Sequence, residues 1–142
     1  MAIAQCQTTS FKVGLFCGTF NFNTGTTQVY KMALYSASAE LGAATTAYTP
    51  TGEITGPGYT AGGATLTISQ VPTSSGTVAY LSFADVTWSG AQTARGALIY
   101  LANGTTNPSV AVLDFGADKT STTTFTVPFP SPSSTTAIVR IK

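Results

Sequence analysis

The feature that most constrains this chain is a series of short apolar segments separated by turns rich in glycine, proline, serine and threonine. In the clearest case Phe125, Val127 and Phe129 occupy alternate positions, a period of two that turns one face of a strand toward a core. Pro128 has no N–H for a sheet ladder, so this strand is expected at an edge, or to end there. The pattern favours an antiparallel sheet over a helical fold.

The strand-like segments recur along the chain with irregular connections between them. Segment 37–63 contains Pro50 and several glycines, which predicts a long irregular loop of the kind that often makes contacts. The number and spacing of the segments predict an all-β antiparallel sandwich, jelly-roll-like, with an immunoglobulin-like sandwich as the alternative. Strands are predicted over residues 29–36, 64–69, 77–88, 93–101, 109–115, 122–129 and 136–142.

The N-terminal arm, residues 1–22, follows a different pattern. Phe11, Leu15 and Phe16 fall at helical spacing, which predicts one short helix that lies on a sheet or on a neighbouring subunit. Thr9 or Ser10 is its expected N-cap, and Gly18 is its expected end. With 142 residues in all, the chain fits a single domain, residues 1–142.

The surface has few charges, since only 8% of the residues are charged, against roughly 25% in an ordinary domain. Threonine and serine take their place, so the exterior suits burial by neighbouring copies; the alternative is a monomer that hydroxyl groups keep in solution. The net charge is +1 and the basic residues are scattered, which argues against nucleic-acid binding. No apolar run approaches the ~20 residues of a membrane span.

Two segments, 97–101 and 110–113, are apolar on both faces. Strands of this kind either lie in the middle of a core or have one face covered by a partner. The sequence leaves these two alternatives open.

The residues that usually carry catalysis are scarce. The chain has no histidine, which removes the common general base and metal ligand, and we expect no catalytic residue, no cofactor, no metal and no enzymatic activity. Asp114 and Asp118 flank Gly116 and are interpreted as parts of a turn. Cys6 and Cys17 are expected as buried or half-buried thiols, with a bridge between them as the alternative.

Asp85, Trp88 and Arg95 flank a predicted turn at residues 89–91. Antiparallel pairing about position 90 would bring Asp85 opposite Arg95, with Trp88 alongside. The group is then either a local staple of a hairpin or an anchor between subunits, since Trp and Arg are frequent in binding hot spots.

Aromatic residues form two further candidate contact sites. Phe11 and Phe16 either pack the helix onto the domain or belong to a docking arm. Tyr48 and Tyr59 lie in the long glycine-rich loop, where we expect them to be exposed and able to contact a sugar.

Four segments, KMALYSASA at 31–39, EITGPGYTAGG at 53–63, TARGALIY at 93–100 and AVLDFGADKT at 111–120, resemble small virion proteins of tailed bacteriophages. The resemblance implies a protein made in the host cytoplasm and incorporated in the virion. We expect a capsid decoration, or cement, protein whose partners are the major capsid protein and copies of itself, as a homodimer or homotrimer. The alternative is a neck, tail or tail-fibre component that binds a receptor or glycan.

Overall fold

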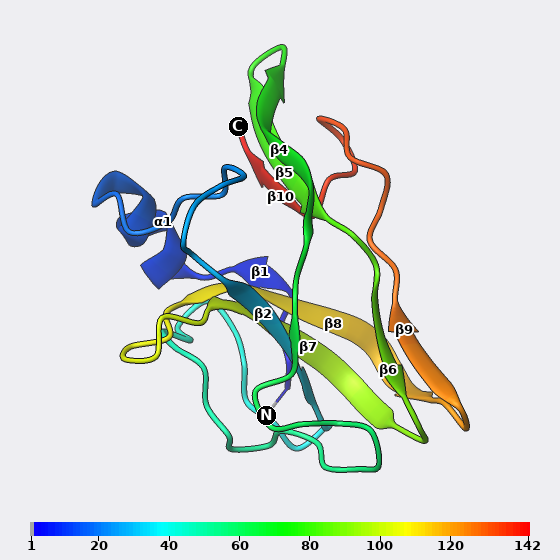
Figure 1. Cartoon of the computed structure of the whole chain (residues 1–142). Coiled ribbons are helices and arrows are strands. Elements are labelled where there is room, and N and C mark those ends of the chain that lie inside the picture. Colours follow the sequence, from blue (N-terminus) through cyan, green and yellow to red (C-terminus); the bar gives the residue numbers. More distant parts are fainter. Residues whose placement is uncertain (1) are drawn as a thin grey trace.

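The computed structural model describes residues 2–142, and in that range the chain forms one helix and ten strands. The predicted all-β fold with antiparallel sheets and one short N-terminal helix is confirmed (Figure 1). The elements are β1 (Cys6–Gln7), α1 (Thr9–Phe16), β2 (Tyr30–Tyr35), β3 (Ala64–Thr65), β4 (Ile68–Ser75), β5 (Val78–Phe83), β6 (Val86–Ser89), β7 (Thr93–Leu101), β8 (Ser109–Thr120), β9 (Thr124–Val127) and β10 (Val139–Ile141).

The main layer is a five-stranded sheet in the order β1-β8-β7-β2-β3. The second layer consists of two smaller sheets, β10-β5-β4 and β6-β9. Met32 and Ile99 of the main sheet share one buried core with Phe83, Trp88 and Phe125 of the smaller sheets. The two layers are therefore held together as a sandwich by apolar side chains. The β4–β5 hairpin projects from this body at the top of Figure 1.

The opposite face of the main sheet is also buried, but within residues 2–142 no second sheet covers it. Tyr35, Leu98 and Val112 on this face pack against Leu41 from the irregular stretch 36–63 and against Ile3. The apolar character of β7 and β8 on both faces is thus explained by the chain's own covering segment. The alternative, a partner that covers this face, is wrong.

Several strand boundaries differ from the predicted ones because the chain changes sheet in the middle of an apolar segment. Predicted strand 77–88 is divided at residues 84–85 into β5 and β6, which belong to different sheets. Predicted strand 64–69 is likewise divided between β3 and β4. Hydropathy does not record which sheet a strand joins, so a continuous apolar pattern hides such a crossing.

Helix α1 is present where the sequence predicts it, but its cap lies one residue earlier than Thr9. The hydroxyl of Thr8 accepts a hydrogen bond from the Phe11 N–H at 3.2 Å. The Thr8 backbone N–H donates in turn to the Val110 carbonyl of β8 at 3.0 Å. Thr8 both caps the helix and fastens its start to the main sheet, so Thr8, and not Thr9 or Ser10, is the N-cap.

Candidate functional site: an apolar face at helix α1

Helix α1 presents apolar side chains to solvent as well as to the core. Phe11 is buried and packs against the ring of Phe20, with ring centroids 4.9 Å apart. Val13 and Phe16 point outward, three positions apart and therefore on one side of the helix, and are 55% and 91% exposed. Phe11 is thus a packing residue, while Phe16 is the most exposed of the large apolar side chains described.

An apolar groove lies beside the helix, between α1 with the segment after it and the sheet β10-β5-β4. The groove has a volume of about 250 Å³. None of the residues that line it carries a charge. Its walls include Phe11, Leu15 and Phe20 on the helix side, and Pro72, Val139 and Ile141 on the sheet side.

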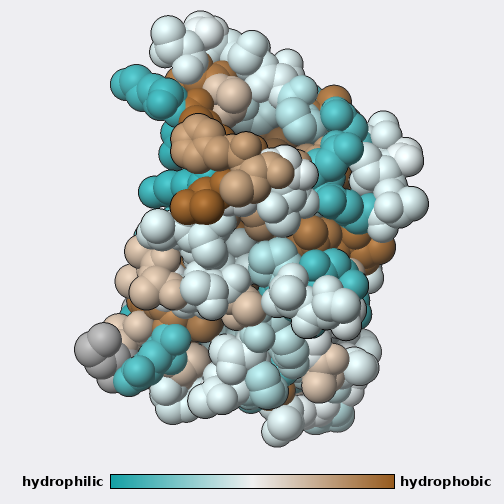
Figure 2. Space-filling model, turned by 90° about the vertical axis from the view of Figure 1, so that its left-hand side faces the viewer, coloured by the Kyte–Doolittle hydropathy of each residue, from teal (hydrophilic) through white to brown (hydrophobic). Residues whose placement is uncertain are grey.

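Most of the exposed large apolar side chains lie on the elements that form this groove. Among the described residues five large apolar side chains are exposed. Four of them, Val13, Phe16, Val71 and Ile141, lie on α1, β4 and β10, the elements that form the groove, and Ile141 also lines it. Figure 2 looks onto this side of the molecule, where brown apolar side chains gather in the upper half. We call these four residues and the groove the α1 apolar face. Exposed apolar side chains that gather on one side of a molecule often mark a contact with another macromolecule.

The structure separates the three residues Asp85, Trp88 and Arg95. Strand β6 pairs with β9, while β7 pairs with β2 and β8, so the predicted hairpin between residues 85 and 95 does not form. Asp85 instead accepts a hydrogen bond from the Phe129 N–H at 2.9 Å. Trp88 is 5% exposed and packs against Phe125 in the core. The staple is therefore wrong, and the three residues do not form one anchor, because they lie apart and Trp88 is buried.

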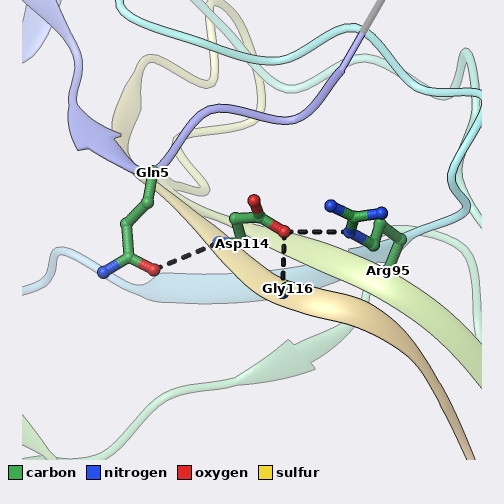
Figure 3. A network of polar contacts seen from close by, with 4 residues as sticks. All are labelled: Gln5, Arg95, Asp114 and Gly116. Carbon is green, nitrogen blue, oxygen red and sulfur yellow. Dashed lines mark hydrogen bonds and ion pairs between the residues drawn. The ribbon is translucent and has the colours of Figure 1, made fainter.

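Arg95 pairs with a different carboxylate, Asp114 on the neighbouring strand β8 (Figure 3). Its Nε lies 3.0 Å from Asp114 Oδ1, which also accepts the Gly116 N–H at 2.9 Å. The Asp114 backbone N–H donates to Oε1 of Gln5 at 3.2 Å. The hydrogen bonds from Arg95 and Gly116 lower the pKa of Asp114 and keep its carboxylate ionised.

The interpretation of residues 114–118 as a turn is wrong, because β8 continues through them to Thr120. The register between β7 and β8 slips here, so that Ala94 faces Lys119 while Gly96 faces Asp114. Gly116 has a φ of 80°, a conformation that a glycine adopts without strain. The strand absorbs the extra residues as a bulge and stays in the sheet.

Tyr48 and Tyr59 are not the exposed residues that the sequence predicts. Both hydroxyls donate to Glu53, Tyr48 to Oε2 at 2.6 Å and Tyr59 to Oε1 at 2.7 Å. The Gly62 N–H donates to the same Oε1 at 2.7 Å. Burial, and then the hydrogen bond to Glu53, raises the pKa of each tyrosine. We call Glu53, Tyr48, Tyr59 and Gly62 the Glu53 cluster. Its hydrogen bonds link residues of the irregular stretch 36–63 to one another.

The two cysteines are free thiols, so the Cys6–Cys17 bridge is not formed. Cys6 is half-buried and its pKa is raised by burial, whereas Cys17 is exposed at the end of α1. The expectation of two buried or half-buried thiols is therefore wrong for Cys17. In residues 2–142 no group of three metal-ligating side chains comes together, and no helix there is long and apolar enough to cross a membrane.

Two features of the structure, the Glu53 cluster and the α1 apolar face, were not predicted from the sequence. The role of Glu53 gave no local signal, since its partners are five to nine residues away along an irregular stretch. The α1 apolar face did leave a signal: Val13 and Phe16 are spaced by three, on a side of the helix different from Phe11 and Leu15. A helix that is apolar on two sides has a second surface to cover.

The comparisons with known proteins add no relative. No protein-family model matches the chain, and no curated protein or solved structure matches it either. The functional argument therefore depends on the sequence and on the surfaces of the structure itself.

Proposed function

We propose that this chain is a structural protein of a bacteriophage particle, a capsid decoration protein that stabilises contacts between major capsid subunits. The observation that carries the proposal is the α1 apolar face, where Phe16 is 91% exposed on a helix whose other side lines an uncharged groove. Exposing such side chains in an isolated molecule costs free energy, and burying them against a neighbour recovers roughly 25 cal/mol for each Å² removed from water. The surface is suited to being covered in an assembly.

The remainder of the surface supports the same proposal. With 8% charged residues and a net charge of +1, copies of the chain repel one another weakly, so dense packing on a shell is favourable. The resemblance of segments 31–39, 53–63, 93–100 and 111–120 to small phage virion proteins agrees with a place in the particle. The proposed partners are the major capsid protein and further copies of this chain.

Copy number distinguishes the decoration role from the neck or tail alternative. Quantitative gel densitometry of purified virions is expected to show hundreds of copies per particle for a decoration protein, against a few tens or fewer for a neck or tail component. The alternative of a glycan-binding tail component loses its structural support, because the hydroxyls of Tyr48 and Tyr59 are hydrogen-bonded to Glu53.

The α1 apolar face is tested by substitution in the phage. Phe16→Ser is expected to leave the folded protein intact, because this side chain lies outside the core, and to reduce its incorporation into particles at least tenfold. Val29→Ser is the matched control, since Val29 is 42% exposed but lies just before β2 and not on α1. Equal incorporation of both variants would show that the α1 apolar face is not the attachment surface.

A further inference from the structure

Strand β9 has one free edge. It pairs with β6 through Val86↔Val127 to Ser89↔Thr124, and no strand of the described chain pairs with its other side. The Gly90 N–H donates to the Thr123 carbonyl at 2.6 Å, so these two opposite residues form a hydrogen-bonded pair, and every second pair along the ladder does the same. Because antiparallel hydrogen bonds alternate along a strand, the backbone N–H and C=O groups of Thr124 and Thr126 point away from β6.

A long groove runs beside this edge. Its first part is a hollow of about 550 Å³ that is lined by every residue from 124 to 128. Successive residues of a strand point to opposite faces, so a hollow that touches all of them lies along the backbone edge rather than on one face. Gln5, Leu113 and Ile138 also line a second hollow of about 600 Å³, so the two hollows adjoin at these residues and together are called the groove.

The backbone groups on the two walls of the groove differ in their hydrogen bonding. On the β8 wall the Asp114 N–H is taken by Gln5 and the Gly116 N–H by the Asp114 carboxylate, which Arg95 holds in place (Figure 3). Side chains thus close this edge, as is usual for exposed strand edges. On the β9 wall no hydrogen bond closes the backbone of Thr124 or Thr126, although the structure describes both residues.

The chemistry of the groove defines what it can accept. Leu113, Phe115 and Ile138 give it an apolar lining. Lys119 lies along its first part and Arg140 and Lys142 along its second, while its one acidic lining residue, Asp114, is already paired with Arg95. The charge left uncompensated is positive, and it complements an acidic ligand.

We infer that this groove accepts an extended acidic segment of another polypeptide, which adds to the free edge of β9 as an extra strand. Main-chain hydrogen bonds to Thr124 and Thr126 supply affinity, and alternate apolar side chains of the added strand reach the lining of the groove. Acidic residues near its ends face Lys119 and the pair Arg140 and Lys142. This site differs from the α1 apolar face and stands independently of the location of the protein in a particle.

The test uses the purified full-length chain and a fluorescent synthetic peptide of alternating valine and threonine with glutamate at both ends. Thr126→Pro removes the side-chain hydroxyl and, of the backbone hydrogen-bonding groups, only the N–H that faces the groove, which β6 does not use. The native Pro128, two residues on, has its missing N–H on the same side of the strand. Thr126→Val is the matched control, because it also lacks the hydroxyl but keeps the N–H. Binding is followed by fluorescence anisotropy, and far-ultraviolet circular dichroism checks the fold of both variants.

The wild type and Thr126→Val are expected to bind the peptide with equal affinity, and Thr126→Pro at least tenfold more weakly. Amide exchange of Thr124 and Thr126 in the wild type is expected to slow when the peptide binds, a readout that needs no variant. A peptide with lysine in place of glutamate is expected to bind at least tenfold more weakly than the acidic one.

Three results would overturn the inference. The first is an acidic peptide that does not bind the wild type at low salt, or that binds without slowing these two amides. The second is an equally tight complex with the lysine peptide. The third is a peptide-free dimer, seen by analytical ultracentrifugation and lost in Thr126→Pro, which would assign the edge to a second copy of the chain.

Discussion

The two faces of the main sheet are covered in different ways. One face is covered by regular strands, yet part of that cover, the β4–β5 hairpin, extends into solvent with most of its β4 residues exposed. The other face is covered by the irregular stretch 36–63, which has no strand of its own but places Ala39 and Leu41 in a buried cluster. Regular secondary structure is thus no guide to which region is firmly held.

The irregular stretch is held by polar contacts that replace a strand. The Ile54 N–H donates to the Leu34 carbonyl at 3.0 Å, and the Leu34 N–H donates to the Tyr59 hydroxyl at 2.9 Å. These two bonds occupy the edge of β2 beyond the short strand β3. The Glu53 cluster then fixes Tyr59, so one carboxylate supports contacts that a ladder would otherwise make.

The largest effect that separates the two regions is expected at high pH. Tyr35, Tyr48, Tyr59 and Tyr100 lie on or beside the irregular stretch, and burial raises the pKa of each, to about 12 for Tyr100. Tyrosine in an unfolded chain titrates near pH 10. The protonated forms therefore stabilise the fold below about pH 10, and this contribution is lost as the pH rises through the raised values.

We expect tyrosinate absorbance and loss of the circular dichroism signal to appear together, near or above pH 12. A fold that stays intact while these four tyrosines ionise near pH 10 would contradict the buried network.

A cavity substitution under the irregular stretch is expected to have the next largest effect. Leu98 is fully buried beneath it, so Leu98→Ala should lower the free energy of unfolding by about 2–5 kcal/mol. Val71→Ala in the projecting hairpin is the comparison, with an expected change within about 0.5 kcal/mol. Urea unfolding measures both, and similar values for the two variants would mean that the stretch does not cover the sheet in solution.

The Glu53 cluster is tested by Glu53→Gln, which keeps the shape of the side chain but removes its charge. The amide can accept fewer of the three hydrogen bonds, so a loss of roughly 1–3 kcal/mol in the free energy of unfolding is expected. Asp118→Asn is the control, because Asp118 is exposed and should change stability by less than about 0.5 kcal/mol. An unchanged free energy of unfolding in Glu53→Gln would show that burial alone holds the irregular stretch in place.

The smallest effect is expected at Asp114. Its pKa is lowered by Arg95 and Gly116, so its ionised form stabilises the fold above about pH 4 and this contribution is lost as the pH falls through the lowered value. The ion pair is open to solvent, and such pairs contribute little. Urea midpoints measured across the acidic range should decline slightly less in Asp114→Asn than in the wild type. An equally steep decline of the urea midpoint in both proteins would show that the Asp114 carboxylate does not contribute to the loss of stability in acid.

Much of the fold could be predicted because it depends on local pattern. The alternation at residues 125–129 and the helical spacing of Phe11 and Leu15 depend on burial of one face, which the sequence records directly. The partners of a strand are not recorded in that way. Residues 85 and 95 looked like two sides of one hairpin, but the chain passes from one sheet to the other between them. Topology decided that Arg95 meets Asp114 and not Asp85.

The candidate site was predicted less well than the fold, for a related reason. Exposure of Phe16 follows from which side of α1 meets the sheet, and Thr8 fixes that through its bond to Val110. Tyr48 and Tyr59 are tied down by a carboxylate that the sequence places among glycines and threonines without any motif. Both outcomes depend on tertiary contacts that a pattern of hydropathy does not contain.

Burial of the α1 apolar face in the assembled particle can be measured at Cys17, the exposed thiol next to Phe16. In a Cys6→Ser background, a maleimide should label Cys17 rapidly in the free protein and at least tenfold more slowly in intact virions. Labelling that is equally fast in the two states, or virions that lack the protein altogether, would contradict the account.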